Sequence, residues 1–473
     1  MTSPSSSRAL GDIDTADFRA AAHRAVEWVA VYLDEIRERP VFPAVAPGDI
    51  RRALPSVPPE QGEALDRILD DFERLILPGI THWNHPRFFA YFGITGSTPG
   101  ILAELLIAAL NVNAMLWKTS PAATELEEVT CDWLRQAVGL PEGFAGVIND
   151  TASSSTLYAL AAAREAVPHL QIRRQGMSGA RLRMYTSEEA HSSVEKAGIV
   201  LGVGQENIVK VPTDSAFRMD VAALEDAIRA DRQDGHHPFA VVATVGTTSV
   251  TAIDPVAAIS RVCAEEKLWL HVDAAYGGAA AVLQSHRWVL DGCEGADSVV
   301  INPHKWLFTP IDCSILYCRH EYLLKRAFSL TPAYLRESDA EGVRNLMDYG
   351  ASLGRRFRAL KLWFVLRAFG LDGARARIAA HIEMAQELRS WIETDPAFEV
   401  LAPSPFSTVV FRHRSTDANN ERIHDAVNRS GLAFISHTDV RGTYALRMAI
   451  GNLRTMLEDV RAAWDLIRTA AAS

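Results

Sequence analysis

The pentapeptide Asn302-Pro303-His304-Lys305-Trp306 decides how the rest of this chain is interpreted. It follows residues 296–301, an apolar, β-branched run that predicts a buried parallel strand. In open α/β sheets ligands bind beyond the carboxyl ends of the strands, and a partly desolvated lysine placed there can react with an aldehyde. Spacing alone favours a plainer alternative, a lysine extended along the surface, because most lysines are solvated.

A second strand-like segment, residues 268–278, favours a chemical role for Lys305 over a surface position. Its apolar part ends at Asp273 and small residues follow, so Asp273 and Lys305 are expected to end two strands of one sheet. Pyridoxal phosphate needs such a pair. The lysine holds its aldehyde, and the aspartate keeps the pyridine nitrogen protonated so that the ring can accept electrons.

The block His271-Val272-Asp273-Ala274-Ala275-Tyr276, followed by residues 302–306, closely resembles the pyridoxal-phosphate-dependent aromatic L-amino acid decarboxylases, which are group II decarboxylases of the aspartate-aminotransferase fold. The resemblance covers most of the chain, from about Asp17 into the C-terminal region. It implies an α/β fold, the PLP-dependent transferase-like fold type I, whose large domain has a mainly parallel sheet. We expect an N-terminal helical arm at residues 1–90, the cofactor-binding domain at 91–371 and a small α+β domain at 372–473.

Composition limits the class of partner. The 473 residues carry a formal charge of −10, which argues against nucleic acid or an anionic membrane as a partner, because either favours a basic patch. Five scattered cysteines without a C-x-x-C pair indicate neither a disulfide framework nor a metal site. With no signal peptide or membrane span recognisable, we expect a cytoplasmic protein.

Periodicity predicts alternating helices and strands. Residues 17–39 carry apolar side chains on one helical face, and in the resembled family this arm wraps a second subunit, which implies a homodimer. Packing of that face within one chain is equally compatible with the pattern. Further elements are expected at the following residues: helices 64–76, 157–166, 192–200, 256–266, 374–393 and 419–430; strands 183–186, 239–245, 408–412, 432–436 and 444–449.

A hydroxyl-rich turn at residues 147–156 is the expected phosphate site. It enters the Ala-rich helix, and small residues at a helix N-terminus offer free backbone N–H groups to an anion. Such a turn is often only a good N-cap. By the resemblance, Thr151, Ala152 and Ser153 contact the cofactor, although family members often carry more glycine here.

The resemblance assigns the remaining cofactor and catalytic residues. It implies that His191 stacks on the cofactor ring and that Lys305, Asp273 and His191 take part in catalysis; from the residues alone, His191 is more often structural. The other implied cofactor contacts are Thr248, Ala275, Asn302, His304 and Gly354.

Substrate contacts are expected in two segments. Residues 81–93 are densely aromatic, which usually indicates core, but in the family this stretch lines the substrate pocket. Gly93 and Ile94 stand where animal aromatic enzymes have a proline and a hydroxylated residue, and Asn113 and Met115 replace an aliphatic and an aromatic residue. The pocket should therefore be reshaped and more polar. The implied contacts are Trp83, Tyr91, Phe92, Gly93, Ile94, Asn113 and Met115.

Tyr334 bears on the outcome of the reaction. In the family a tyrosine here donates the proton to Cα after CO2 leaves, whereas aldehyde synthases commonly carry phenylalanine. The sequence therefore predicts decarboxylation of tryptophan, tyrosine, dopa or phenylalanine to an amine. Alternatives are an aldehyde synthase, an aminotransferase, a decarboxylase of another amino acid such as histidine, or a cofactor-binding protein without catalysis. A nucleotide-dependent oxidoreductase is disfavoured because no G-x-G-x-x-G motif opens a helix after a strand.

Overall fold

A seven-stranded sheet forms the centre of the large domain. The computed structural model describes residues 12–167, 170–177, 179–330 and 343–473. In those residues the strand order is β1-β7-β6-β5-β4-β2-β3, and β7 runs against both of its neighbours while the other pairs are parallel. The strands are β1 Ala145–Asn149, β2 Leu182–Ser187, β3 Ile208–Val211, β4 His237–Thr244, β5 Trp269–Asp273, β6 Ser298–Ile301 and β7 Ser314–Cys318. The expected mainly parallel sheet is confirmed.

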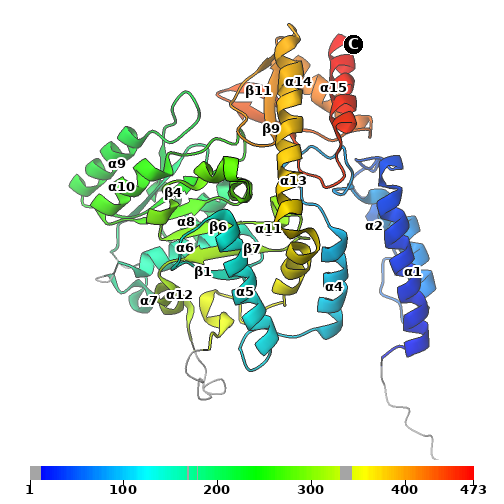
Figure 1. Ribbon diagram of the computed structural model, residues 1–473, viewed down its shortest axis with the longest axis horizontal. Helices are drawn as coiled ribbons and strands as arrows, with labels where there is room; N and C mark the ends of the chain where they lie inside the picture. Colours follow the sequence, from blue (N-terminus) through cyan, green and yellow to red (C-terminus); the bar gives the residue numbers. More distant parts are fainter. Residues whose placement is uncertain (1–11, 168–169, 178, 331–342) are drawn as a thin grey trace, which may run out of the picture.

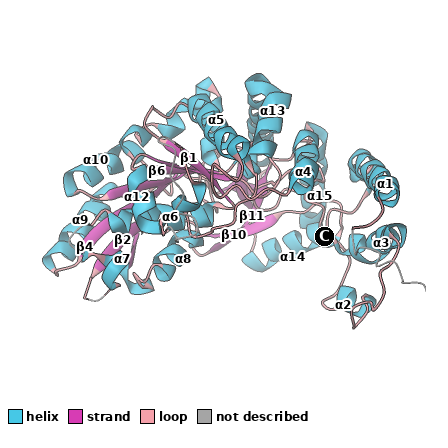
Figure 2. Cartoon of the chain, turned by 90° about the horizontal axis from the view of Figure 1, so that it is seen from below, coloured by secondary structure: helices cyan, strands magenta, loops and turns pink. Residues whose placement is uncertain are grey.

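Helices cover both faces of this sheet (Figure 2). Successive residues of the central strands alternate between two cores: Val241 and Leu270 belong to one, and Val242 and Trp269 to the other. Both faces are apolar because both are buried, so these strands read as continuous apolar runs. The covering helices of the large domain are α4 Thr98–Leu110, α5 Pro121–Val138, α6 Ala152–Glu165, α7 Ile172–Gln175, α8 Ser192–Val200, α9 Val221–Gln233, α10 Val256–Glu266, α11 Pro303–Trp306 and α12 Glu321–Phe328.

Helix α6 begins earlier than its sequence pattern predicts. The predicted start was residue 157, but the helix starts at Ala152, directly after the turn that follows β1. Hydroxylated residues 153–156 therefore form the first turn of the helix. Ser155 and Thr156 are buried, and their hydroxyls are hydrogen-bonded to Ser314 and His271, which offsets the cost of burying them in the helix.

The N-terminal arm stands beside the main body (Figure 1). Its helices are α1 Thr15–Asp34, α2 Asp49–Ala53 and α3 Leu65–Asp71, and the Asp14 side chain caps α1 by accepting from Ala16 N–H. The side chains of Phe18 and Val26 on α1 are more than half exposed. No helix in the described part of the chain is long and apolar enough to cross a membrane.

The C-terminal part is a second, smaller sheet packed with helices. Helix α13, Ala359–Thr394, enters it with a break at Gly370, whose φ is 63°. The strand order is β10-β11-β9-β8, with β8 Phe398–Val400, β9 Thr408–His413, β10 Ser436–Val440 and β11 Thr443–Ala449; helices α14 Asp417–Arg429 and α15 Leu457–Ala472 cover it.

One predicted strand in this domain is wrong. Residues 432–436 were expected to form a strand, but β10 begins only at Ser436. The apolar stretch pairs instead with the arm: Phe434 N–H donates to Arg87 O, and Phe89 N–H donates to Phe434 O. The Phe434 side chain packs against Val41, Phe88 and Ala90, a tertiary contact that local periodicity does not reveal.

Candidate active site

Lys305 lies in the short helix α11 just beyond the end of β6. Its Nζ atom is 5.1 Å from the centre of the Phe92 ring. Burial lowers the pKa of Lys305, and the charge of Arg447 lowers it further, while Asp273 acts in the opposite direction. A lysine in these surroundings gives up its proton more readily than a surface lysine, so its amine is better prepared to attack an aldehyde.

Asp273 ends the neighbouring strand β5, as the sequence predicts. Its Cα pairs with Val300 on one side and Thr244 on the other, and its side chain is 6% exposed. Oδ1 accepts from Ala275 N–H at 3.1 Å, and Ala275 is itself buried. The second carboxylate oxygen makes no hydrogen bond to a described residue, so it can accept one from a ligand.

His191 is the N-cap of α8, which explains its fixed orientation. Its Nδ1 accepts from Ser193 N–H at 3.1 Å and lies 2.7 Å from Ser193 Oγ. A nitrogen that accepts from a backbone N–H carries no hydrogen, so the neutral ring has its hydrogen on Nε2. Part of the ring is exposed; desolvation of the rest lowers its pKa, while the charge of Asp273 raises it.

The residues expected near the cofactor phosphate lie in a row at the ends of three neighbouring strands, β1, β7 and β6. Asn149 of β1 pairs with Ser314 of β7, and the antiparallel register of β7 with β6 places Asn302 just past the Ile301–Ile315 pair. Ser155 Oγ, in the first turn of α6, contacts Asn149 Nδ2 at 3.1 Å and Ser314 Oγ at 3.0 Å. The start of α6 is thereby fixed next to this row.

Backbone N–H groups are free at the start of α6, where the sequence predicts contacts with the cofactor phosphate. Thr151 is the N-cap of α6, but its side chain makes no capping hydrogen bond. The N–H groups at the start of the helix therefore remain available, at the positive end of its dipole. Ala152 is partly exposed and Ser153 is exposed, as contacts of a ligand must be before it binds.

Thr248 lies in the exposed part of the turn after β4. Its neighbour Ser249 accepts from Arg447 Nε at 3.2 Å through its carbonyl oxygen. The turn thus connects a predicted cofactor residue to the small domain. The Thr248 hydroxyl makes no hydrogen bond to the described residues around Lys305, and its role remains a prediction.

Aromatic rings form one wall beside Lys305. Phe92 is 8% exposed and stacks on Tyr276 with ring centres 3.9 Å apart. Trp83 and Tyr91 stack at 5.7 Å and are 36% and 56% exposed. Of the predicted substrate residues, Phe92 therefore lies against Lys305, while Trp83 and Tyr91 form a separate, more exposed pair.

Gly93 and Ile94 continue this segment. A Cβ added at Gly93 would lie 3.2 Å from the backbone of Gly451, so any side chain there requires that backbone to shift by a few tenths of an ångström. Ile94 is partly buried. The departure from the animal pattern at Gly93 has a packing reason.

Asn113 and Met115 lie in a different cluster, together with the segment that carries Gly354. Asn113 Oδ1 accepts from Arg355 N–H at 2.9 Å, and Asn113 Nδ2 lies 3.4 Å from Met115 Sδ. The polar atoms of Asn113 are thus used within this cluster. In the described part of the chain neither Asn113 nor Met115 makes a hydrogen bond to Phe92 or Lys305, so their contact with substrate stays a prediction.

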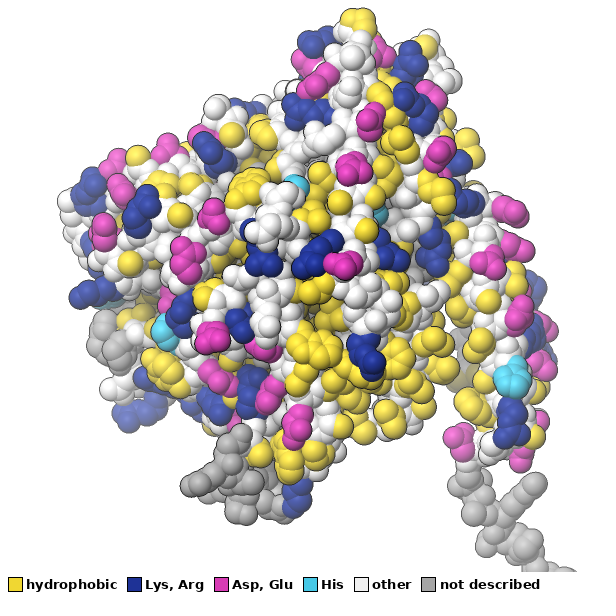
Figure 3. Space-filling model, in the orientation of Figure 1, with side chains coloured by type: hydrophobic (Ala, Val, Ile, Leu, Met, Phe, Trp, Pro, Cys, Tyr) yellow, Lys and Arg dark blue, Asp and Glu magenta, His cyan; other side chains and the backbone are white. Residues whose placement is uncertain are grey.

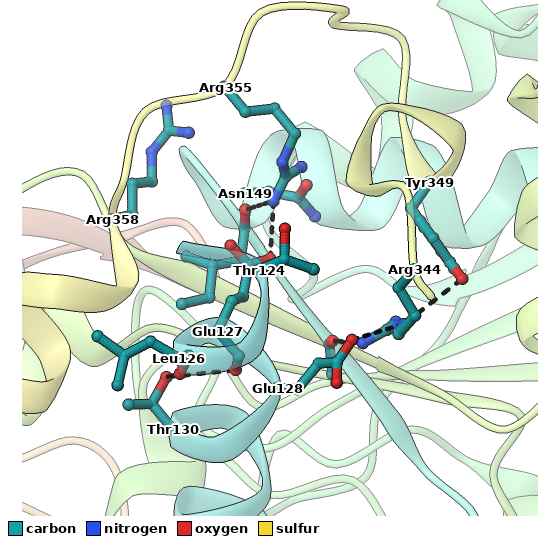
Figure 4. Close-up of polar contacts among 12 residues, drawn as sticks. Thr124, Leu126, Glu127, Glu128, Thr130, Asn149, Arg344, Tyr349, Arg355 and Arg358 are labelled. Atoms are coloured by element: carbon teal, nitrogen blue, oxygen red, sulfur yellow. Dashed lines mark hydrogen bonds and ion pairs between the residues drawn. The ribbon is translucent and has the colours of Figure 1, made fainter. Parts of the chain in front are cut away.

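Gly354 borders a small polar cavity of about 60 Å3 that also touches Asn149 and Asp150. Figure 4 shows Arg355 pointing toward Glu127 of α5. Its Nη2 donates to Glu127 Oε1 at 2.7 Å and to Ile148 O, in β1, at 2.8 Å. Glu127 also accepts from Ile148 N–H at 2.8 Å. This buried ion pair fixes the Gly354 segment against the end of β1.

Arg447 is a site residue that the sequence analysis missed. It comes from β11 of the small domain, is 3% exposed, and its guanidinium carbon lies 4.7 Å from the Phe92 ring centre. Nη1 donates to Tyr91 O at 2.5 Å, while Nη2 is buried without a partner. Burial lowers the pKa of Arg447 to about 10. Only its position in a strand could have been read from the sequence, because its partners Tyr91 and Ser249 lie 356 and 198 positions away.

Tyr334 lies outside the described residues, so its assignment stays a prediction from the resemblance. The described groups fit pyridoxal phosphate in their chemistry. Lys305 supplies an amine with a lowered pKa, Asp273 a carboxylate oxygen without a partner, and Asn302 a buried side-chain amide with one polar atom unpaired. A polar atom left unpaired in a buried site is expensive unless a ligand satisfies it.

Comparisons with known proteins agree with this geometry. Residues 47–414 match the model of the pyridoxal-dependent decarboxylase conserved domain. Aromatic-L-amino-acid decarboxylase of Sus scrofa is 40% identical over 97% of this chain and 97% of its own length. Phenylacetaldehyde synthase of Arabidopsis thaliana is 39% identical over 99% and 98%. The crystal structure of Oryza sativa TDC with PLP and tryptamine superposes with a TM-score of 0.94 at 36% identity, covering 98% of this chain and 99% of that one.

Proposed function

This chain belongs to the pyridoxal-dependent decarboxylase family, and we propose that it converts an aromatic L-amino acid to the corresponding amine and CO2. Its cofactor is pyridoxal 5′-phosphate. The observation that carries the aromatic substrate class is Phe92, whose ring lies over the amine of Lys305 and stacks on the ring of Tyr276. An aromatic side chain gains contact area and offset stacking on such a wall.

Each residue has a defined task in this reaction. When bound, the cofactor supplies a ring that takes up the electrons left on Cα as the carboxylate departs. Lys305 would hold its aldehyde, Asp273 would keep its pyridine nitrogen protonated, and His191 would lie against its face. Tyr334 would deliver the proton to Cα.

Arg447 provides a positive charge on the substrate side of Lys305. Its unpaired Nη2 supports a role in binding the α-carboxylate, because a guanidinium binds carboxylates well in a desolvated site.

The direct test is a product assay. A panel of tryptophan, tyrosine, dopa, phenylalanine and histidine should be incubated with the holoenzyme while CO2, amine, aldehyde and peroxide are measured. We expect CO2 and an aromatic amine in equal amounts. Aldehyde and peroxide in place of amine would assign the chain to the aldehyde-synthase branch, and release of histamine alone would refute the aromatic class.

We further propose that the active enzyme is a homodimer. Four leucines of α4 are 44–58% exposed: Leu102, Leu105, Leu106 and Leu110. Hydrophobic side chains gather over α4 in the space-filling view, next to the arm (Figure 3). An apolar face of this kind marks a protein interface, and a two-fold dimer is the commonest way to bury it.

Sedimentation velocity tests the dimer. Leu105→Glu should yield a monomer with little activity, because a charge would be buried in the interface. Val200→Glu is the control, since Val200 is 69% exposed on α8. An active wild-type monomer at assay concentration would refute the dimer. The five cysteines are free and buried, which suits a reducing compartment, so the cytoplasm is the proposed location.

A further inference from the structure

The side chain of His304 is held by a backbone donor. Cys313 N–H donates to His304 Nδ1 at 2.9 Å, and the ring is 3% exposed. A backbone N–H can only donate, so Nδ1 must carry a lone pair. Burial, and the nearby charge of Lys305, lower the pKa of His304 to about 3, so the ring is neutral near pH 7. Because Nδ1 accepts a hydrogen bond and carries no hydrogen of its own, the neutral imidazole of His304 has its hydrogen on Nε2.

The hydrogen on Nε2 determines which way the neighbouring amide must face. The side-chain amide of Asn302 lies 3.3 Å from His304 Nε2 with Nδ2 toward the ring, while Oδ1 is buried without a partner. In that orientation Nδ2 and Nε2 both present hydrogens to each other. A half turn of the amide replaces this clash by a hydrogen bond from Nε2–H to Oδ1, and an amide's two orientations are distinguished only by such partners.

We infer that His304 is a positioning residue: it locks the Asn302 amide with its oxygen toward the imidazole and its NH2 group toward the phosphate of the cofactor. This inference rests on the proposed function, because it takes pyridoxal phosphate as the ligand. The relay runs from Cys313 N–H through the imidazole to Asn302. After the half turn, the side chain of Asn302 places its NH2 group, a hydrogen-bond donor, where the unpaired Oδ1 stood before.

The position of Asn302 supports a phosphate as the recipient. It follows β6 in the row formed by Asn149 and Ser314, beside the start of α6, where Thr151 leaves backbone N–H groups free. An NH2 group buried without an acceptor is costly, and a phosphate oxygen relieves that cost with a charge-assisted hydrogen bond. An amide oxygen at the same place would repel the anion.

Two substitutions test the roles of Nδ1 and Nε2 of His304 separately. His304→Asn can keep an acceptor near Nδ1 for Cys313 N–H but lacks a donor at the place of Nε2. His304→Gln can place its amide nitrogen near Nε2 and restore the donor to Asn302. We expect His304→Asn to weaken binding of pyridoxal phosphate to the apoenzyme by about tenfold or more, and His304→Gln to stay within about threefold of wild type.

Pyridoxal, which lacks the phosphate, is the matched control ligand. Its affinity should change by less than about twofold in His304→Asn, because the lost contact concerns only the phosphate. Asn302→Asp should also lose affinity for pyridoxal phosphate selectively, since the oxygen not bonded to His304 faces the anion. Equal losses for both ligands, or wild-type binding by His304→Asn, would overturn the inference.

The tautomer can be measured directly in the wild-type protein, independently of any binding assay. In protein labelled with 15N in the histidine rings, the resonances absent from His304→Gln identify His304, and their shifts distinguish Nε2–H from Nδ1–H. We expect Nε2–H, unchanged between pH 6 and 8; an Nδ1–H tautomer or a charged ring would overturn the inference. A wild-type protein that binds neither ligand would instead contradict the proposed function, and the tautomer would still decide the hydrogen-bond relay.

Discussion

The amine of Lys305 lies over the face of the Phe92 ring, with Nζ 5.1 Å from the ring centre. The guanidinium of Arg447 lies 4.7 Å from the same ring centre. One aromatic side chain from the segment after the arm therefore contacts two cations, one from the large domain and one from the small domain. This arrangement attracts both cations to the ring while their mutual repulsion lowers the pKa of the lysine.

Lys305→Ala should abolish covalent attachment of the cofactor. Borohydride should fix the cofactor to the wild-type protein, and peptide mapping should place it on Lys305; the variant should show neither the attachment nor activity. Lys196→Ala, which removes an exposed lysine of α8, is the control and should behave as wild type. Full activity in Lys305→Ala would refute the assignment of the site.

Arg447→Met should raise the pKa of Lys305 in the apoenzyme. The charge of Arg447 lowers that pKa, so its removal makes the lysine hold its proton to higher pH. The midpoint of the pH dependence of cofactor uptake should therefore move upward, and the KM for substrate should increase. Arg51→Met, an exposed arginine of the arm, is the control. An unchanged midpoint would show that Arg447 exerts no charge effect on Lys305.

Glu127→Gln should destabilise the protein much more than Glu128→Gln. Glu127 pairs with Arg355, and the two side chains are 2% and 6% exposed, whereas Glu128 is 38% exposed and 3.9 Å from Arg344. Removing one partner of a buried pair leaves a buried charge and costs about 3–5 kcal/mol, while an exposed pair is worth about 0–1 kcal/mol. Urea unfolding of both variants measures the difference, and equal losses would refute this ranking.

Acid should destabilise the fold through histidines that are neutral when buried. Burial lowers the pKa of His381 to about 4 from 6.5, where it accepts from Trp306 Nε1–H and donates to Asn452 O. Between these two values the unfolded chain binds a proton that the folded chain does not, so stability falls as pH falls through 6.5. Each such histidine contributes about 1.4 kcal/mol per pH unit. Three other buried histidines behave alike: His85, His271 and His304.

Comparison of variants isolates this effect. His381→Gln removes one titrating group, so the free energy of unfolding should fall less steeply between pH 6.5 and 4.5 than in wild type, by about 1.4 kcal/mol per pH unit. His23→Gln, on the exposed face of α1, should keep the wild-type slope. A parallel slope in His381→Gln would mean that this histidine binds its proton as readily in the folded protein as in the unfolded chain.

Residues that act through their place at a strand end could be predicted from the sequence. Asp273 and Lys305 follow apolar runs, and the parallel sheet brings those ends together without help from distant segments. Arg447 and the Glu127–Arg355 pair could not be predicted, because their surroundings are created by tertiary packing between segments hundreds of residues apart. The strand wrongly expected at residues 432–436 failed for the same reason: the backbone and side chain of Phe434 contact the arm.

Tyr334→Phe should change the product rather than the binding of cofactor. Tyr334 lies outside the described residues, so this prediction rests on the resemblance to the decarboxylases. A phenol can donate a proton to Cα and a phenyl ring cannot. Without that donor the carbanionic state persists and can meet oxygen. Among the relatives, a phenylacetaldehyde synthase is 39% identical to this chain, so the fold accommodates both outcomes.

Wild-type protein should therefore release mainly amine, and Tyr334→Phe should shift the products toward aldehyde, ammonia and peroxide at an unchanged cofactor content. Tyr322→Phe is the matched control, because Tyr322 is 66% exposed on α12 and should have no part in proton transfer. Products are measured by chromatography and a coupled peroxide assay under air and under argon. Argon should suppress the aldehyde made by Tyr334→Phe, because oxygen is its oxidant. If the variant makes amine at the wild-type rate under air, the proton comes from another group, and Tyr334 is not the donor.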